Sequence, residues 1–251
     1  MSIVSLLVYG CATHPVTVEI EPRPADPRGH ISTRPGRPGV VVAAPHGTSD
    51  SRTGEIASEI ARRTGFALVV ATGFTLETGA DGRPLRRYQV NRPSEGRPGF
   101  SPAHDQATPA ARQIYEEYER RVREAARGPL RFYVEIHGNG REENAGRIEI
   151  ATAGVDRDHA LQLRTLLELT RDAHLRGQPE APRLAILVEP ADAVFYAAGG
   201  AKRDGILQVP ERALHIELPR AARREFREIY TTILAEFLAE AVALRPLPAG
   251  R

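Results

Sequence analysis

Two apolar segments of this chain each end in a His-Gly pair, and this repeated pattern limits the folds that the chain can adopt. Residues 40–44 read Val-Val-Val-Ala-Ala and are followed, after one proline, by His46. Residues 130–136 form a second, mainly apolar run that leads directly to His137. Apolar runs of this length are typical of buried strands. Because ligands of open α/β sheets bind beyond the carboxyl ends of strands, we expect the two imidazoles to meet at one edge of a sheet.

Predicted strands and helices alternate along the rest of the chain. Short apolar runs predict the strands, and apolar residues spaced three or four positions apart predict the helices. The expected strands are residues 39–44, 66–71, 130–137, 147–152, 184–188 and 213–218. The expected helices are residues 53–63, 108–127, 156–176 and 219–244, with residues 73–106 and 197–205 as loops. This alternation predicts an α/β fold, a three-layer α/β/α sandwich with a mixed, mostly parallel sheet.

The length and charge of the chain narrow its class. A chain of 251 residues favours one large domain. We expect residues 1–38 to be an N-terminal segment with a proline-rich arm, and residues 39–251 to be a single α/β catalytic domain. A net charge of +2, from 34 basic and 32 acidic residues, gives no case for nucleic acid as a partner. No apolar run reaches the roughly 18 residues that a transmembrane helix needs.

Cys11 is the only cysteine, so no disulfide can form within the chain. It follows a short apolar stretch, residues 3–9, and a glycine, as the acylated cysteine does in a shortened bacterial lipoprotein signal. The alternative is an ordinary first strand or a frayed end. The sequence therefore leaves two locations open, the cytoplasm and, if Cys11 is lipidated, the cell envelope. It leaves the oligomeric state undetermined.

We expect His46, Glu55 and His137 to be the ligands of a Zn²⁺ ion. Zinc binds imidazole nitrogens and carboxylate oxygens, and a catalytic site keeps three protein ligands and one water position. Asp50 is the competing carboxylate, because it is nearer to His46 in sequence. Glu55 is preferred because it opens the next predicted helix, and a helix start is a more rigid platform than a loop. Either histidine alone would indicate a structural residue, whereas two strand-end His-Gly pairs favour a metal.

The last predicted strand supplies a candidate catalytic carboxylate. Alternate side chains of a strand share one face, so His215 and Glu217 are expected to point together. A carboxylate beside a metal-bound water can serve as general base and then as general acid, and we expect Glu217 to have this role. Glu135 is next in line, because strand alternation places it on the same face as His137. The alternative for Glu217 is a salt bridge with Arg220.

The predicted loop 73–106 contains three residues suited to binding a substrate carboxylate, namely Arg87, Asn91 and Arg92. A guanidinium group grips a carboxylate through two parallel hydrogen bonds, which suits the recognition of acidic substrates. We expect all three to contact the substrate, and Arg92 to take part in catalysis as well. The alternative is a solvated basic loop.

These segments, in this order, resemble the N-formylglutamate amidohydrolase family, which is related in fold to zinc carboxypeptidases and succinylglutamate desuccinylases. The matching pieces are Pro45-His46-Gly47, the acidic residue that opens the next helix, Asn91-Arg92, Glu135-Ile136-His137-Gly138 and Ile216-Glu217-Leu218-Pro219-Arg220. The resemblance implies a zinc-carboxypeptidase-like fold and a zinc site on His46, Glu55 and His137. It also implies a catalytic Glu217 and a carboxylate-binding pair, Asn91 and Arg92.

The sequence thus favours a zinc-dependent hydrolase of C–N amide bonds. Its expected substrate is a small molecule or peptide with a free carboxylate, such as an N-acyl amino acid. A first alternative is a non-catalytic metal- or carboxylate-binding envelope protein of the same fold, although a binding protein has no need of a base such as Glu217. A second alternative is a nucleophilic hydrolase that uses Ser49 or Ser51 with His46, but the sequence contains no Gly-x-Ser-x-Gly motif.

Overall fold

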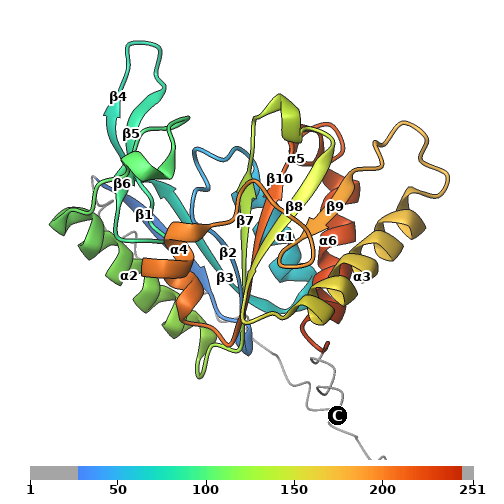
Figure 1. Cartoon of the computed structure of the whole chain (residues 1–251). Coiled ribbons are helices and arrows are strands. Elements are labelled where there is room, and N and C mark those ends of the chain that lie inside the picture. Colours follow the sequence, from blue (N-terminus) through green and yellow to red (C-terminus); the bar gives the residue numbers. More distant parts are fainter. Residues whose placement is uncertain (1–27, 245–251) are drawn as a thin grey trace, which may run out of the picture.

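The computed structural model describes residues 28–244, and Figure 1 shows a twisted sheet between two layers of helices. The main sheet has seven strands in the order β1-β3-β2-β7-β10-β8-β9. These strands are β1 (Gly29–Arg34), β2 (Arg37–Ala44), β3 (Phe66–Gly73), β7 (Phe132–Gly138), β8 (Arg147–Ala153), β9 (Ala185–Val188) and β10 (Arg212–Leu218). The helices are α1 (Thr53–Thr64), α2 (Pro109–Ala126), α3 (Arg157–Leu175), α4 (Gly199–Asp204), α5 (Arg220–Arg223) and α6 (Arg227–Ala241).

The four central strands β3, β2, β7 and β10 run parallel to one another. Strand β1 is antiparallel to β3, and β8 is antiparallel to β10 but parallel to β9. Helices α1, α3 and α6 cover one face of the sheet, and α2 and α4 cover the other (Figure 1). The expected three-layer α/β/α sandwich with a mixed, mostly parallel sheet is confirmed.

Alternating side chains of the central strands fill two separate cores. On β2, Val40 and Val42 pack with residues of α1, α3 and α6, whereas Val41 and Ala43 pack with residues of α2 and α4. The same alternation continues on β7 and β10. Towards the carboxyl ends of these two strands, however, the residues on the side that faces α2 are polar. The apolar packing of the sheet therefore gives way to polar groups where the central strands end.

The segment 73–106 is not the structureless loop that the sequence suggested. It forms a three-stranded sheet of β4 (Thr75–Thr78), β5 (Pro84–Tyr88) and β6 (Glu95–Gly96), followed by a short 3₁₀ turn at Pro102–His104. Asp-Gly is a hairpin signal, and Gly82 adopts a φ of 75° in the turn that joins β4 to β5. This hairpin stands above one side of the main sheet (Figure 1).

Three further predictions need correction. Residues 29–34 form the edge strand β1, so the domain begins before residue 39; prolines are tolerated next to an edge strand. The predicted loop at residues 197–205 contains the short helix α4. The predicted closing helix is two helices, α5 and α6, separated by residues 224–226.

Cys11 and the proposed lipidation signal lie outside the described residues. Among residues 28–244, the helices are all too short or too polar to cross a membrane.

The assignment of residues to the two cores predicts how substitutions change the free energy of unfolding. Ile216 on β10 is fully buried against the α1, α3 and α6 layer. We expect Ile216→Ala to lower the free energy of unfolding by about 2–5 kcal/mol, because it removes buried methyl groups and leaves a cavity. Leu169, which is 65% exposed, supplies the control: Leu169→Ala should change that free energy by less than about 0.5 kcal/mol. Urea titration measures both, and equal losses would contradict the assignment of the core.

Candidate metal centre

At the carboxyl ends of β7 and β10, five polar side chains lie on the face of the sheet that α2 covers. Tyr133, Glu135 and His137 alternate along β7, and His215 and Glu217 alternate along β10. The parallel register places Glu135 opposite His215 and His137 opposite Glu217. All five side chains are buried. The expectation that His215 and Glu217 point to the same side is confirmed, and so is the expectation that Glu135 lies on the same face as His137. The structure adds that these two pairs face the same side of the sheet.

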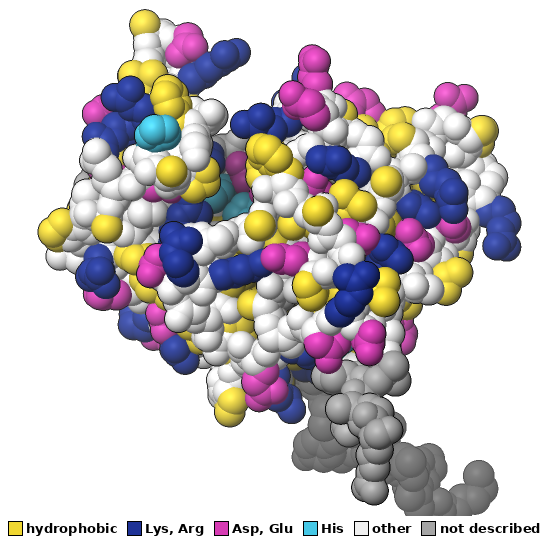
Figure 2. Space-filling view, in the orientation of Figure 1, with side chains coloured by type: hydrophobic (Ala, Val, Ile, Leu, Met, Phe, Trp, Pro, Cys, Tyr) yellow, Lys and Arg dark blue, Asp and Glu magenta, His cyan; other side chains and the backbone are white. Residues whose placement is uncertain are grey.

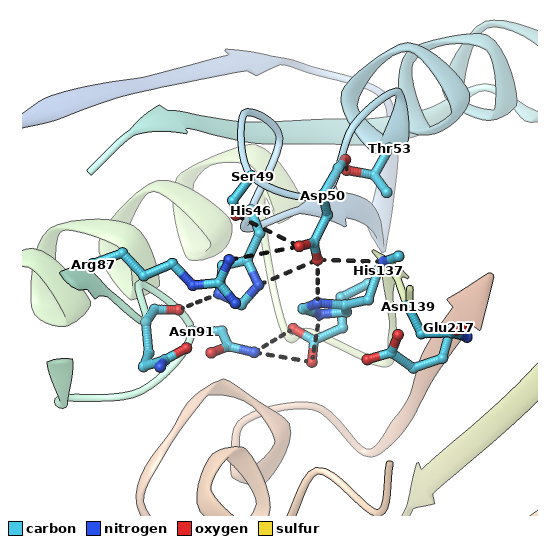
Figure 3. A network of polar contacts seen from close by, with 12 residues as sticks. His46, Ser49, Asp50, Thr53, Arg87, Asn91, His137, Asn139 and Glu217 are labelled. Atoms are coloured by element: carbon cyan, nitrogen blue, oxygen red, sulfur yellow. Dashed lines mark hydrogen bonds and ion pairs between the residues drawn. The ribbon is translucent and has the colours of Figure 1, made fainter. Parts of the chain in front are cut away.

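His46, Asp50 and His137 form one compact group, which we call the His-Asp-His cluster (Figure 3). Oδ2 of Asp50 lies 3.4 Å from Nδ1 of His46 and 3.3 Å from Nδ1 of His137. The same oxygen accepts a hydrogen bond of 3.3 Å from the backbone N–H of Gly138. The two histidine rings meet edge to face, with their centroids 4.9 Å apart. The expected convergence of the two strand-end imidazoles is confirmed.

All three residues of the cluster are buried. Figure 2 shows histidine side chains recessed below the surface, between the part of the molecule that carries the β4–β5 hairpin and the part that carries β8 and β9. His46 is 9% exposed and His137 is 3% exposed. Both imidazoles of the cluster are therefore largely shielded from bulk water.

Behind the two imidazoles, a hydrogen bond to His46 and a carboxylate close to His137 leave both Nδ1 atoms facing Asp50, where a metal ion would bind. Nε2 of His46 lies 2.9 Å from the carbonyl oxygen of Gln89, which only accepts hydrogen bonds, so Nε2 carries a hydrogen and Nδ1 is the nitrogen that would bind a metal ion. Nε2 of His137 faces Oε1 of Glu135 at 3.3 Å. A carboxylate or a carbonyl in this position is the usual partner behind a zinc-bound histidine.

The two distances from Asp50 to the imidazole nitrogens also fit zinc. Donor atoms around a tetrahedral zinc ion with bonds of about 2.0–2.2 Å lie about 3.3–3.5 Å from one another. The two Nδ1–Oδ2 distances, 3.4 Å and 3.3 Å, fall in that range. Two nitrogens and one carboxylate oxygen are also the donor types that catalytic zinc sites use. His46, Asp50 and His137 therefore fit a zinc ion.

The protonation of the cluster follows from burial and from neighbouring charges. Burial raises the pKa of the Asp50 carboxyl, but hydrogen bonds with His137 and His46 outweigh this and hold it well below its usual value. Burial and the charge of Arg87 lower the pKa of His46. Burial lowers the pKa of His137, but the charge of Glu135 and hydrogen bonds with Asp50 and Glu135 raise it to about 10. A metal ion would therefore displace a proton from His137 on binding.

Glu135 is a fully buried carboxylate with four partners. Its Oε1 lies 2.6 Å from Nδ1 of His215, and its Oε2 accepts a hydrogen bond of 3.2 Å from the hydroxyl of Tyr133. The side-chain amide of Asn91 donates to both oxygens, at 3.2 and 3.3 Å. Burial raises the pKa of this carboxyl, but the charges of His137 and His215 and their hydrogen bonds lower it below its usual range. A buried charge is stable when it is compensated in this way.

The glycine of the second His-Gly pair allows a buried arginine to approach. A Cβ on Gly138 would lie 2.5 Å from Cζ of Arg223, which is too close for any real side chain. Arg223 donates hydrogen bonds to the carbonyl oxygens of Leu218, Ser51 and Asn139, at 3.1, 2.8 and 2.8 Å. It therefore joins the end of β10, the loop after β2 and the end of β7. No local sequence pattern indicates this role, because two of the three partners, Ser51 and Asn139, come from distant segments.

The glycine of the first His-Gly pair has a similar role. A Cβ on Gly47 would lie 3.0 Å from the carbonyl oxygen of Ala71 and 3.0 Å from a methyl carbon of Val70. Its backbone N–H donates to the same carbonyl oxygen at 2.9 Å. The loop that carries His46 thus lies directly against the end of β3.

The preference for Glu55 over Asp50 as the carboxylate ligand is wrong in this geometry. The side chain of Glu55 is 52% exposed and forms ion pairs with Arg52 and Arg227. The first turn of α1 directs it into a surface depression beside α6. The loop that carries Asp50 is held by hydrogen bonds, because the backbone N–H of Asp50 donates to the carbonyl oxygen of His46 and its own carbonyl accepts from the hydroxyl of Thr53. Asp50 therefore completes the cluster.

The three residues expected to bind a carboxylate have different surroundings. Nη1 of Arg87 lies 3.7 Å from Oδ1 of Asp50, so this guanidinium lies beside the cluster (Figure 3). Nη2 of Arg92 is instead engaged by Asp105 at 2.5 Å, and its Nε donates to Ser94. Asn91 is 1% exposed and supports Glu135. The structure thus brings only Arg87 of the three next to the donor atoms of the cluster.

Glu217 and Asn139 have side-chain polar atoms without a hydrogen-bond partner among the described residues. Oε1 of Glu217 faces Nε2 of His215 at 3.2 Å, whereas Oε2 has no hydrogen-bond partner among residues 28–244. Within that same range, the ion pairs of Glu217 do not include Arg220. Asn139 is 3% exposed, and neither of its side-chain polar atoms is bonded to another described residue. Sequence reasoning missed Asn139, although it directly follows the second His-Gly pair.

Comparisons with known proteins found matches among solved structures. No protein-family model matches the sequence, and no curated protein matches it. A bacteriophage poly-gamma-glutamate hydrolase is similar in structure, with a TM-score of 0.46, 16% identity and coverage of 89% of this chain and 91% of that one. The zinc-free form of YndL gives a TM-score of 0.47 and 15% identity over 86% of this chain and 92% of that one. A metallo-carboxypeptidase from Burkholderia cenocepacia gives a TM-score of 0.40 and 12% identity over 86% of this chain and 66% of that one. Membership of the N-formylglutamate amidohydrolase family is not shown and stays a prediction.

The geometry makes opposite predictions for the two carboxylates that the sequence left in competition. We expect Asp50→Ala to lose bound zinc, because it removes one of three protein ligands, and Glu55→Ala to retain it. Elemental analysis after dialysis measures zinc per chain in both proteins. Glu55→Ala is also a control for the loss of an acidic side chain from the same segment. Loss of zinc from Glu55→Ala with retention in Asp50→Ala would restore the sequence-based assignment.

Proposed function

We propose that this protein is a zinc-dependent amidohydrolase that cleaves an amide bond in a carboxylate-bearing substrate, such as an N-acyl amino acid or a short peptide. The observation that supports it most strongly is the His-Asp-His cluster, with one nitrogen of each imidazole and one carboxylate oxygen within 4.8 Å of one another. A second carboxylate, Glu217, lies next to His137 in the sheet with one oxygen open. Three metal ligands and a separate carboxylate are the parts that metal-assisted hydrolysis requires.

His46, Asp50 and His137 would hold the zinc ion. When bound, zinc supplies Lewis acidity, which polarises a carbonyl oxygen and makes a water molecule more acidic. Gln89 would orient the His46 imidazole through its hydrogen bond, and Glu135 lies behind His137, 3.3 Å from its Nε2. The burial of the cluster limits the access of bulk water, which strengthens electrostatic interactions with the substrate.

Glu217 is the proposed general base and general acid. Its open Oε2 can accept the proton of the attacking water and then deliver it to the nitrogen of the departing amine. The two serines near the cluster have other contacts, which weakens the case for a nucleophilic serine. The hydroxyl of Ser49 lies 3.5 Å from Asp50, and that of Ser51 accepts a hydrogen bond from Arg223.

Arg87 is the proposed partner of negative charge on the substrate. Its side chain is 22% exposed, lies beside Asp50 and has an Nε that forms no hydrogen bond with any of residues 28–244. A guanidinium in this place can bind a substrate carboxylate or the oxyanion that develops at the cleaved carbonyl. Of the arginines that the sequence assigned to substrate binding, we retain Arg87 and not Arg92, because Arg92 is already paired with Asp105.

The test of the proposed function combines metal analysis with a substrate panel. Purified protein should contain about one zinc per chain and hydrolyse at least one member of a panel of N-acyl amino acids and short peptides. A chelator should abolish the activity, and added zinc should restore it. Bound zinc without hydrolysis of any panel member would favour the alternative of a metal-binding protein. Activity that survives complete removal of metal would refute the proposal.

Glu217→Gln should keep the fold and the zinc but lose turnover. Glutamine is nearly isosteric but cannot accept the proton, and a positioned acid–base group contributes about 10²–10⁴-fold to the rate. The measurements are kcat, zinc content and the thermal midpoint of unfolding. Glu236→Gln is a suitable control, because Glu236 is an exposed partner of His174 on another part of the surface. Near-parental turnover in zinc-loaded Glu217→Gln would move the base elsewhere, with Glu135 next.

Arg87→Lys should bind carboxylate-bearing substrates more weakly than the parent protein, by about tenfold or more in KM. An ammonium group cannot reproduce the planar fork of the guanidinium. The expected contrast is with the same substrate in amidated form, whose cleavage should be impaired far less. Equal impairment of cleavage for the two forms of the substrate would show that Arg87 contacts the oxyanion or Asp50 and does not bind the substrate carboxylate.

A further inference from the structure

His215 lies between two buried carboxylates, and neither the metal site nor the substrate accounts for it. Its Nδ1 is 2.6 Å from Oε1 of Glu135, and its Nε2 is 3.2 Å from Oε1 of Glu217. Carboxylate oxygens accept hydrogen bonds, so the Nε2–H of His215 donates to Glu217. The ring also stacks on that of His137, with centroids 4.1 Å apart and an angle of 29° between the planes.

The imidazole of His215 is itself held firmly by a chain of buried groups. The hydroxyls of Tyr118 on α2 and Tyr133 on β7 lie 2.8 Å apart, and Tyr133 donates to Glu135. Tyr118, Tyr133 and Glu135 are all fully buried. Glu135 then contacts His215, so a continuous chain of hydrogen bonds runs from α2 to Glu217. A continuous chain of buried hydrogen bonds of this kind restricts the rotamers of its members.

This chain leaves the two oxygens of Glu217 in different situations. Oε1 is the oxygen that faces His215, and Oε2 has no hydrogen-bond partner in the described part of the chain. A glutamate side chain has three rotatable bonds, and a base must be positioned to within a fraction of an ångström to work well. His215 restricts the carboxylate through Oε1 and leaves Oε2 for proton transfer.

We propose that His215 is a positioning residue, which orients the Glu217 carboxylate through an Nε2–H hydrogen bond while Glu135 holds its other nitrogen. The proposal rests on the function proposed above, in which Glu217 transfers the proton. The competing explanation is a second metal site on Glu135, His137 and His215, whose donor atoms also lie within 4.8 Å of one another. Hydrogen bonds from Asn91 and Tyr133 already engage both oxygens of Glu135, which favours the positioning role.

Two substitutions of His215 test its two hydrogen bonds one at a time. The amide of His215→Asn can take the place of Nδ1 and contact Glu135, but it does not extend to Glu217. The amide of His215→Gln extends further and can take the place of Nε2. We expect His215→Asn to lower kcat by about 100-fold, the loss that a misplacement of about 1 Å can cause. KM and zinc content should stay near the parental values, and His215→Gln should recover most of kcat.

His159→Asn is the matched control, because His159 is also a fully buried histidine but contacts Arg212 at the opposite end of β10. It should leave kcat unchanged. Parental kcat in His215→Asn, or equal losses in the Asn and Gln variants, would overturn the proposal. Loss of zinc from both His215 variants would overturn it in favour of a metal-site role.

A crystal structure of His215→Asn tests the proposal without any substrate. We expect the Glu217 carboxylate to leave its parental position or to become disordered, while His46, Asp50 and His137 remain in place. An unmoved, well-ordered Glu217 would overturn the positioning role. If the parent protein hydrolyses nothing in the panel, the proposed function fails, yet this structural result still decides whether His215 positions Glu217.

Discussion

The Asp50 carboxylate is the interaction on which the arrangement of the site depends. A single oxygen of this group faces Nδ1 of His46 and Nδ1 of His137 and accepts the backbone N–H of Gly138. It thereby joins the loop after β2 to the end of β7. Without a cation, the shared oxygen is satisfied by a proton on His137, whose pKa is raised to about 10. With a cation, the same three atoms form a ready set of ligands at distances suited to zinc.

The parallel pairing of β7 with β10 supplies the second half of the site. Because side chains alternate along strands, a shift of one residue in the register would send Glu217 to the opposite, apolar face. The observed register sets Glu217 beside His137 and His215 beside Glu135. Arg223 then holds the ends of both strands to the loop that carries Asp50, through three backbone carbonyl oxygens. The chemistry therefore depends on sheet register and on one buried arginine.

Much of this could be predicted from the sequence, because it follows from local patterns. The apolar runs before His46 and His137 identify buried strands, and strand alternation places His215 and Glu217 on one face. The choice between Asp50 and Glu55 could not be made in this way, because Arg227, which pairs with Glu55, comes from a helix far along the chain. The same is true of Arg92, whose availability depends on the position of Asp105. The β4–β5 hairpin was missed despite its Asp-Gly turn, because Gly, Pro and Arg around it obscured the short strands.

The most direct test of the zinc site is a crystal structure of the zinc-loaded protein, with anomalous diffraction data collected on both sides of the zinc absorption edge. The proposed site predicts one strong anomalous peak, bonded to Nδ1 of His46, Nδ1 of His137 and Oδ2 of Asp50. A peak bonded instead to Glu135 and His215, or the absence of any peak near His46, would contradict it.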